Sequence, residues 1–153
     1  DRAPAAASMT VRVLVADDHE PFRGAARSVL AATHGFELVG EASSGEEAVD
    51  LVAELRPDLV LMDIKMPGLG GIGATRSIAD AYPATTTVLL STYREQDLPI
   101  HALSCGAIAY LHKSNLDAAR CARCGHGVSP CRRGRGSRPG HACERRPRTR
   151  ARA

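Results

Sequence analysis

The stretch Leu59-Val60-Leu61-Met62-Asp63-Ile64-Lys65-Met66-Pro67-Gly68 decides how this chain folds. Its first four residues are all apolar, which is typical of a strand buried on both faces of a parallel sheet. An aspartate follows at once, and the Pro67-Gly68 pair then predicts a turn. A carboxylate therefore stands where a buried strand ends.

Short apolar runs alternate with helical patterns on both sides of this stretch. Further strands are predicted at residues 11–16, 36–42, 87–90 and 107–111. Helical periodicity predicts one helix from Pro21, one opened by a Ser44/Glu47 capping box, a weaker one over 72–82, and one over 97–105 with Pro99 in its first turn. This alternation predicts an α/β doubly wound fold around a parallel sheet.

Length and composition limit the class of protein. The chain has 153 residues, which predicts one domain and excludes a large multidomain enzyme. Its 44% hydrophobic residues include no Trp and only two Phe and three Tyr, so the core must be aliphatic. We find no apolar run of membrane-spanning length and no secretory signal in residues 1–8. A cytoplasmic location without membrane contact is therefore expected.

Polar side chains follow the predicted strands. Ligands of open parallel sheets bind beyond the carboxyl ends of the strands, so these positions are the ones that matter for function. They hold Asp17-Asp18 after the first strand, Asp63 after the third, Ser91-Thr92 after the fourth and His112-Lys113 after the fifth. Three carboxylates, a hydroxyl and an ammonium are expected to converge.

This set of groups suits phosphoryl chemistry. Three neighbouring carboxylates repel one another unless a cation shares the site, and Mg²⁺ prefers carboxylate oxygens, water and a phosphate. A carboxylate can itself accept a phosphoryl group, while Lys113 and Ser91 contact the phosphoryl oxygens. Asp18 taken alone is equally compatible with a helix N-cap.

Asp17-Asp18, Met62 to Gly68, Ser91-Thr92 and Tyr110 to Lys113 together resemble the receiver domain of bacterial two-component response regulators, over residues 11–113. The resemblance implies a flavodoxin-like, five-stranded parallel sheet of order 2-1-3-4-5. It also implies a signalling protein, not a metabolic enzyme, that is phosphorylated by a sensor histidine kinase and loses the phosphoryl group slowly by itself.

The resemblance assigns a role to each site residue. Asp63 is the phosphoacceptor and Lys113 contacts the phosphoryl group. Mg²⁺ is held by Asp18 and Asp63, by Asp17 largely through water, and by the backbone carbonyl of Lys65. Ser91 and Tyr110 match the family's switch pair, in which the hydroxyl moves toward the phosphoryl group and the aromatic ring turns inward.

Simpler interpretations remain open beside these. Ser91 is also compatible with a loop hydroxyl, and Tyr110 with a half-buried aromatic on an edge strand. A magnesium-dependent phosphohydrolase would share the sheet and the acids, but its nucleophile ordinarily follows the first strand, whereas here the motif places the acceptor after the third.

Charge divides the chain into unlike parts. Residues 1–113 carry 9 basic and 15 acidic side chains, whereas residues 114–153 carry 11 Arg and 2 acids, and the two sets sum to the overall +3. Four of the five cysteines also lie in the basic part. The predicted division is flanking sequence at 1–9, a receiver domain at 10–116 and an Arg/Cys-rich tail at 117–153.

Three interpretations compete for this tail. It could be a nucleic-acid-binding arm, because arginines attract phosphates. It could be a zinc site with ligands from Cys121, Cys124, His126, Cys131, His141 and Cys143. The favoured interpretation is an out-of-frame translation of a GC-rich gene, since no Lys, Ile, Phe or Tyr follows Leu116. A fifth helix is doubtful here, because residues 117–125 offer only Ala and Cys for an apolar face.

Within the receiver family, Asp17-Asp18-His19 and Leu90 to Tyr93 look most like the LuxR/NarL-type regulators, which often carry a helix-turn-helix output domain. No such domain is expected in the 40 residues after Lys113, which are fewer than the roughly 50 of a small domain. The chain is therefore expected to be a stand-alone receiver or a truncated DNA-binding transcriptional regulator, with homodimerisation left open.

Overall fold

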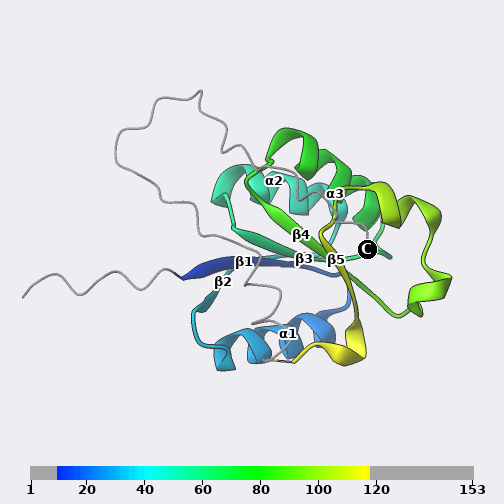
Figure 1. Ribbon diagram of the computed structural model, residues 1–153. Coiled ribbons are helices and arrows are strands. Elements are labelled where there is room, and N and C mark those ends of the chain that lie inside the picture. The colour runs from blue at the N-terminus through cyan, green and yellow to red at the C-terminus, as the bar shows by residue number, and fades with distance from the viewer. Residues whose placement is uncertain (1–9, 118–153) are drawn as a thin grey trace, which may run out of the picture.

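The computed structural model describes residues 10–117, which form a five-stranded sheet with helices on both faces (Figure 1). The strands are β1 (Val11–Ala16), β2 (Phe36–Ala42), β3 (Leu59–Asp63), β4 (Thr86–Ser91) and β5 (Ala109–His112). All neighbouring strands are parallel, in the order β2-β1-β3-β4-β5. The flavodoxin-like fold and its strand order are thus confirmed.

Two apolar layers separate the sheet from its helices. Helix α1 (Glu20–Ala32) covers one face, and α2 (Gly45–Leu55) and α3 (Gly70–Ala81) cover the other (Figure 1). Side chains alternate along β1, so that Val13 and Val15 pack on the α1 side and Leu14 on the α2 and α3 side. Both faces of the central strands are buried, which explains why β3 and β4 are buried at every position.

The helices begin close to the predicted positions. Ser44 is the N-cap of α2, and its hydroxyl accepts a hydrogen bond from the backbone N–H of Glu47. The Glu47 carboxylate turns back to the backbone N–H and hydroxyl of Ser43, one residue before the cap. His19 is the N-cap of α1 without a side-chain cap bond, so Asp18 is not an N-cap.

The predicted helix over residues 97–105 is wrong in type. This part of the chain forms two short 3₁₀ segments, Glu95–Asp97 and Ile100–Ser104. Pro99 does not lie in a first α-helical turn, because it has ψ 138° and precedes the second segment. Gly106, with φ +101°, ends the segment soon afterwards. The extended ψ of Pro99 and the positive φ of Gly106 leave only residues 100–105 between these two breaks, and Ile100–Ser104 forms a 3₁₀ segment there.

The remaining predictions on the chain ends concern residues that lie largely outside 10–117. The flanking sequence at 1–9, the doubtful fifth helix and the three interpretations of the Arg/Cys-rich tail fall outside the described residues. Among the helices of residues 10–117, none has the length and apolar character that crossing a bilayer requires.

Candidate functional site

Four strands deliver polar side chains to one edge of the sheet. Asp17 and Asp18 follow β1, and Asp63 is the last residue of β3. Ser91 is the last residue of β4, and Lys113 directly follows β5. Because the strands are parallel, their carboxyl ends share this edge, as the sequence predicted.

The three aspartates form a compact acidic cluster. Each offers one carboxylate oxygen, and these oxygens all lie within 4.8 Å of one another. Asp17 is fully buried and Asp63 is 4% exposed, whereas Asp18 is exposed. The cluster is therefore enclosed on the sheet side and open to solvent at Asp18, and like charges at this separation repel strongly.

The Lys113 ammonium provides a positive charge inside this cluster. Its Nζ lies 2.5 Å from Oδ2 of Asp17 and 3.4 Å from Oδ2 of Asp63. The same nitrogen lies 4.6 Å from the ring centroid of Phe22, a cation–π contact that helps to hold the ammonium in place. One ammonium faces three carboxylates, so the site keeps an excess of negative charge.

The ionisation of Asp63 reflects these surroundings. Burial raises the pKa of its carboxyl to about 6, and the neighbouring Asp17 carboxylate acts in the same direction. Lys113 and the backbone amide of Lys65 lower this pKa, but they do not offset the burial. A buried carboxyl with such a shifted pKa, beside a cation, is typical of a functional site.

The donor set fits a hard divalent cation. Oδ2 of Asp17 is buried and, apart from its ion pair with Lys113, has no hydrogen-bond partner within residues 10–117. Asp17, Asp18 and Asp63 could together hold a metal ion, and carboxylate oxygens are the ligands that Mg²⁺ prefers. Lys65, predicted to add its backbone carbonyl, has an exposed side chain whose Nζ lies 4.5 Å from the Tyr93 ring centroid.

The predicted switch pair, Ser91 and Tyr110, lines one cavity of about 440 Å³ beside β5. Ser91 is 4% exposed, and its Oγ accepts a hydrogen bond of 2.8 Å from the backbone N–H of Tyr93. The half-buried Tyr110 donates its hydroxyl to the backbone carbonyl of Ala102. Tyr110 also lies on the edge strand β5, so the simpler description of it holds as well.

Two side chains at this edge make contacts that no motif predicts. The Nε2 of His112 lies 3.1 Å from the carbonyl oxygen of Thr92 and so connects the ends of β4 and β5. Arg23 on α1 donates from Nη1 to the carbonyl oxygen of Asp17, at 2.6 Å. The sequence carries a weak signal for Arg23, namely its i, i+3 spacing from Glu20, with which it forms an ion pair.

Known proteins are similar to this chain in sequence and in fold. Residues 13–121 match the response regulator receiver domain family. Response regulator GacA of Pseudomonas viridiflava is 43% identical over 103 residues, which are 67% of this chain and 48% of that protein. Response regulator UvrY of Escherichia coli K12 is 42% identical over 103 residues, 67% of this chain and 47% of that protein. The chain thus spans about half the length of these curated relatives.

Solved receiver structures agree with this sequence match. The signal receiver domain of the response regulator NarL from Mycobacterium tuberculosis has a TM-score of 0.71 and 30% identity, over 77% of this chain and 98% of that chain. The response regulator domain of Thermotoga maritima CheB has a TM-score of 0.69 and 29% identity, over 78% and 96%. Receiver domains are signalling proteins rather than metabolic enzymes. The chain belongs to the response regulator receiver domain family.

Proposed function

We propose that this chain is the phosphoacceptor of a two-component signalling system, in which a sensor histidine kinase phosphorylates Asp63 in the presence of Mg²⁺. The observation that carries the proposal is the setting of Asp63. Its nearly buried carboxyl ends β3, belongs to a three-carboxylate cluster and lies 3.4 Å from the Lys113 ammonium. Response regulators are phosphorylated by sensor histidine kinases, which supplies the class of donor.

The chemistry requires few groups. A carboxylate oxygen of Asp63 attacks phosphorus, so that a P–O bond forms while the P–N bond to the donor's histidine breaks. The electron pair of that bond leaves on the imidazole nitrogen, which takes up a proton. Lys113, 3.4 Å from Asp63, is placed to bind an oxygen of the incoming group and to compensate its charge.

The metal ligands follow from the same cluster. Asp18 and Asp63 would hold Mg²⁺ directly, Asp17 largely through water, and Lys65 by its backbone carbonyl. When bound, the ion neutralises charge on the transferred oxygens. Because Asp17 would contact the ion largely through water, its Oδ2 can keep the ion pair of 2.5 Å with Lys113 and hold that ammonium in position for the phosphoryl group.

Ser91 and Tyr110 would report the phosphorylation state. The Ser91 hydroxyl would exchange its contact with the Tyr93 backbone for one with the new phosphoryl group. Tyr110 would then release the Ala102 carbonyl and turn into the cavity of about 440 Å³ that both residues line. The surface beside β5 would change as a result, and an output partner or a second copy of the chain would bind there.

The proposed output is transcription regulation. A relative that is 38% identical over 108 residues is the transcriptional regulatory protein DegU of Brevibacillus brevis, and the matched region is 45% of that protein. This chain would act as the receiver part of such a LuxR/NarL-type regulator and would pass its signal to a DNA-binding region that residues 10–117 do not contain. Phosphorylation-dependent change in promoter occupancy, measured in the source cells with wild type and Asp63→Asn, tests this output.

Intact-mass spectrometry of the full chain with acetyl phosphate and Mg²⁺ tests the phosphoacceptor. Wild type is expected to gain one phosphoryl group, whereas Asp63→Asn and an EDTA-treated sample gain none. Asp80→Asn, at an exposed position near the end of α3, is the matched control and is expected to react like wild type.

Circular dichroism of every sample separates chemistry from folding. A folded wild-type chain without an adduct would overturn the proposal, as would a folded Asp63→Asn chain that still gains a phosphoryl group. Repeated turnover of a phosphomonoester at about 1 per second or faster would favour the phosphohydrolase instead.

A further inference from the structure

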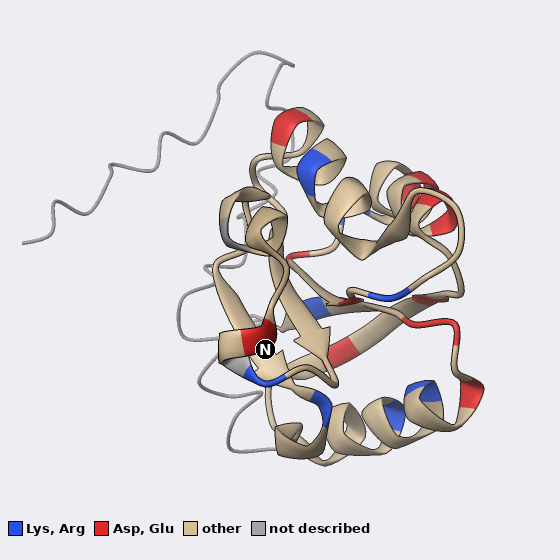
Figure 2. Cartoon of the chain, turned by 90° about the vertical axis from the view of Figure 1, so that its right-hand side faces the viewer, with Lys and Arg blue, Asp and Glu red and all other residues tan. Residues whose placement is uncertain are grey.

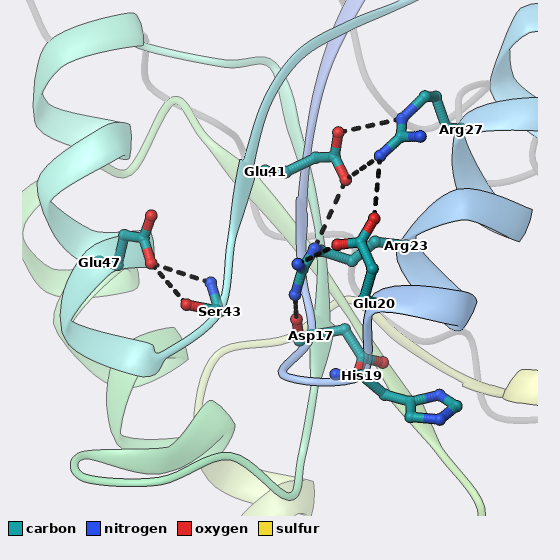
Figure 3. A network of polar contacts seen from close by, with 8 residues as sticks. All are labelled: Asp17, His19, Glu20, Arg23, Arg27, Glu41, Ser43 and Glu47. Atoms are coloured by element: carbon teal, nitrogen blue, oxygen red, sulfur yellow. Dashed lines mark hydrogen bonds and ion pairs between the residues drawn. The ribbon is translucent and has the colours of Figure 1, made fainter.

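Arg23 reaches the acidic cluster from α1 without belonging to it. Its Nη1 donates a hydrogen bond of 2.6 Å to the backbone carbonyl of Asp17, and its side chain is only 16% exposed (Figure 3). The contact joins the first turns of α1 to the loop that carries both Asp17 and Asp18. A partly buried guanidinium therefore holds the backbone from which two of the three clustered carboxylates project.

Two acids from different elements hold the guanidinium itself. Glu20, in the first turn of α1, pairs with Nη2 of Arg23, and Glu41 on β2 lies 3.5 Å from its Nε (Figure 3). The start of α1 is correspondingly acidic and its next turns are basic (Figure 2). Because Glu20 and Glu41 compensate the charge of Arg23, its main effect on the acidic cluster is to hold the Asp17 carbonyl in place through its hydrogen bond.

The polar groups of Asp17 are almost all committed. Its N–H donates to the carbonyl of Ala42 at 2.9 Å, and its Oδ1 accepts from the N–H of His19 at 2.8 Å. Its carbonyl accepts from Arg23. The remaining oxygen, Oδ2, is the buried one that lies beside Lys113. Three hydrogen bonds thus hold the backbone and Oδ1 of Asp17, and Arg23 supplies the only one of the three that comes from a side chain, while Oδ2 itself is held by its ion pair with Lys113.

We propose that Arg23 is a positioning residue for the divalent-cation site. By fixing the Asp17 carbonyl it sets the path of the chain through Asp17 and Asp18, and so the place at which their carboxylates meet Asp63. The inference rests on the proposed function, because it takes this cluster to be the Mg²⁺ site. Residues that orient metal ligands typically change metal affinity by 10–100-fold when removed.

Arg27 offers a matched control one turn along α1. It donates from Nε and Nη2 to the Glu41 carboxylate at 3.1 and 2.9 Å, and it also pairs with Glu20. These acids raise the pKa of its guanidinium, with Glu41 as the larger cause. Its side chain is 50% exposed, and the contacts described for it in residues 10–117 do not include Asp17. Replacing Arg27 removes the same charge from the same acids but leaves the carbonyl of Asp17 bonded.

The test measures metal binding directly, on the full chain. Mn²⁺ is titrated by electron paramagnetic resonance, with Mg²⁺ as competitor, against wild type, Arg23→Met, Arg23→Lys and Arg27→Met. We expect Arg23→Met to weaken Mn²⁺ binding by about tenfold. Arg23→Lys keeps the positive charge but has a single ammonium nitrogen in place of the guanidinium fork. Its Mn²⁺ affinity is therefore expected to lie between those of Arg23→Met and wild type. Arg27→Met is expected to stay within about twofold of wild type, since surface charges act weakly.

The outcomes separate this inference from the proposed function. If wild type binds no Mn²⁺, or binds Mn²⁺ that Mg²⁺ cannot displace, the metal site and the positioning role are both overturned. Equal affinity of wild type and Arg23→Met would overturn the positioning role alone, as would equal losses in Arg23→Met and Arg27→Met. Thermal denaturation without metal identifies unfolded variants. If Arg23→Met does not fold, Arg23→Lys against Arg27→Lys gives the same comparison, with the loss expected in Arg23→Lys only.

Discussion

The ammonium of Lys113 lies 2.5 Å from Oδ2 of Asp17, closer than the 3.4 Å that separate it from Asp63. The fully buried Asp17 thus takes the larger share of the positive charge. Asp63, whose pKa burial and Asp17 raise to about 6, keeps part of its electrostatic penalty. The ionised carboxylate of the proposed phosphoacceptor is therefore destabilised in the folded chain, and a bound divalent cation would stabilise it.

This penalty predicts a pH-dependent stability of the metal-free chain. The pKa of Asp63 is raised from its ordinary 3.8 to about 6 in the fold, so the folded state binds more protons between these values. Stability should therefore fall as pH rises from about 4 to about 6 and stay low above, by about 3 kcal/mol for a shift of about two pKa units. Asp63→Asn should be more stable than wild type near pH 7.5, and the difference should vanish near pH 4. Urea unfolding in EDTA measures both, and parallel pH profiles of the two chains would contradict the prediction.

Replacing Lys113 should destabilise the fold near pH 7.5, whereas replacing Asp63 by Asn should stabilise it. Lys113→Met leaves Oδ2 of Asp17 buried without a counter-charge, so the free energy of unfolding near pH 7.5 should drop by about 3 kcal/mol. The pKa of Asp63 should rise above about 6, because Lys113 lowers it in wild type. Urea unfolding and a carbon NMR titration of the aspartate carboxyls provide the two measurements. Lys65→Met is the control, since the exposed Lys65 should change stability by no more than about 0.5 kcal/mol.

Asp18 should separate metal binding from folding. It is exposed, yet its carboxylate completes the cluster with Asp17 and Asp63. Asp18→Asn is expected to weaken Mg²⁺ binding by about tenfold or more and to change stability by less than about 0.5 kcal/mol. Calorimetric titration with Mg²⁺ and thermal denaturation in EDTA check the two halves, beside Asp80→Asn. A large loss of stability without a change in affinity would show that Asp18 has a structural role instead.

Two glycines should respond in opposite directions to alanine. A Cβ on Gly71 would lie 1.8 Å from the carbonyl oxygen of Asp63, so Gly71→Ala must displace the start of α3 or the end of β3. It should destabilise the fold by about 3 kcal/mol or more and disturb the acid cluster. Gly24 lies within α1 with nothing within 4 Å of its Cβ position, so Gly24→Ala should stabilise the fold by about 0.5–1 kcal/mol. Urea unfolding measures both, and a neutral Gly71→Ala would show that this close approach is not needed.

The fold was readable from local patterns because the strands are buried on both faces. Continuous apolar runs such as residues 59–62, bounded by turn residues and alternating with helical patterns, are typical of central strands in a parallel sheet, and β3 is buried at every position. The acids after them then share an edge, since parallel strands end on the same side. Local patterns were misleading at residues 97–105. The apolar residues there have the spacing of a helix, but the chain forms 3₁₀ turns between the extended Pro99 and the positive φ of Gly106.

Local periodicity and strand direction were therefore enough to predict the class of fold, the edge of the sheet that carries the polar groups and the residues that meet at that edge. Which of these groups contact one another depends on tertiary packing. Three contacts depend on how helices and loops pack over the sheet. They are the shorter ion pair of Lys113 with Asp17 than with Asp63, the hydrogen bond of Arg23 to the backbone of Asp17, and the contact of His112 with Thr92. Such contacts join segments far apart in the chain, and no local pattern encodes the rotation of one element against another.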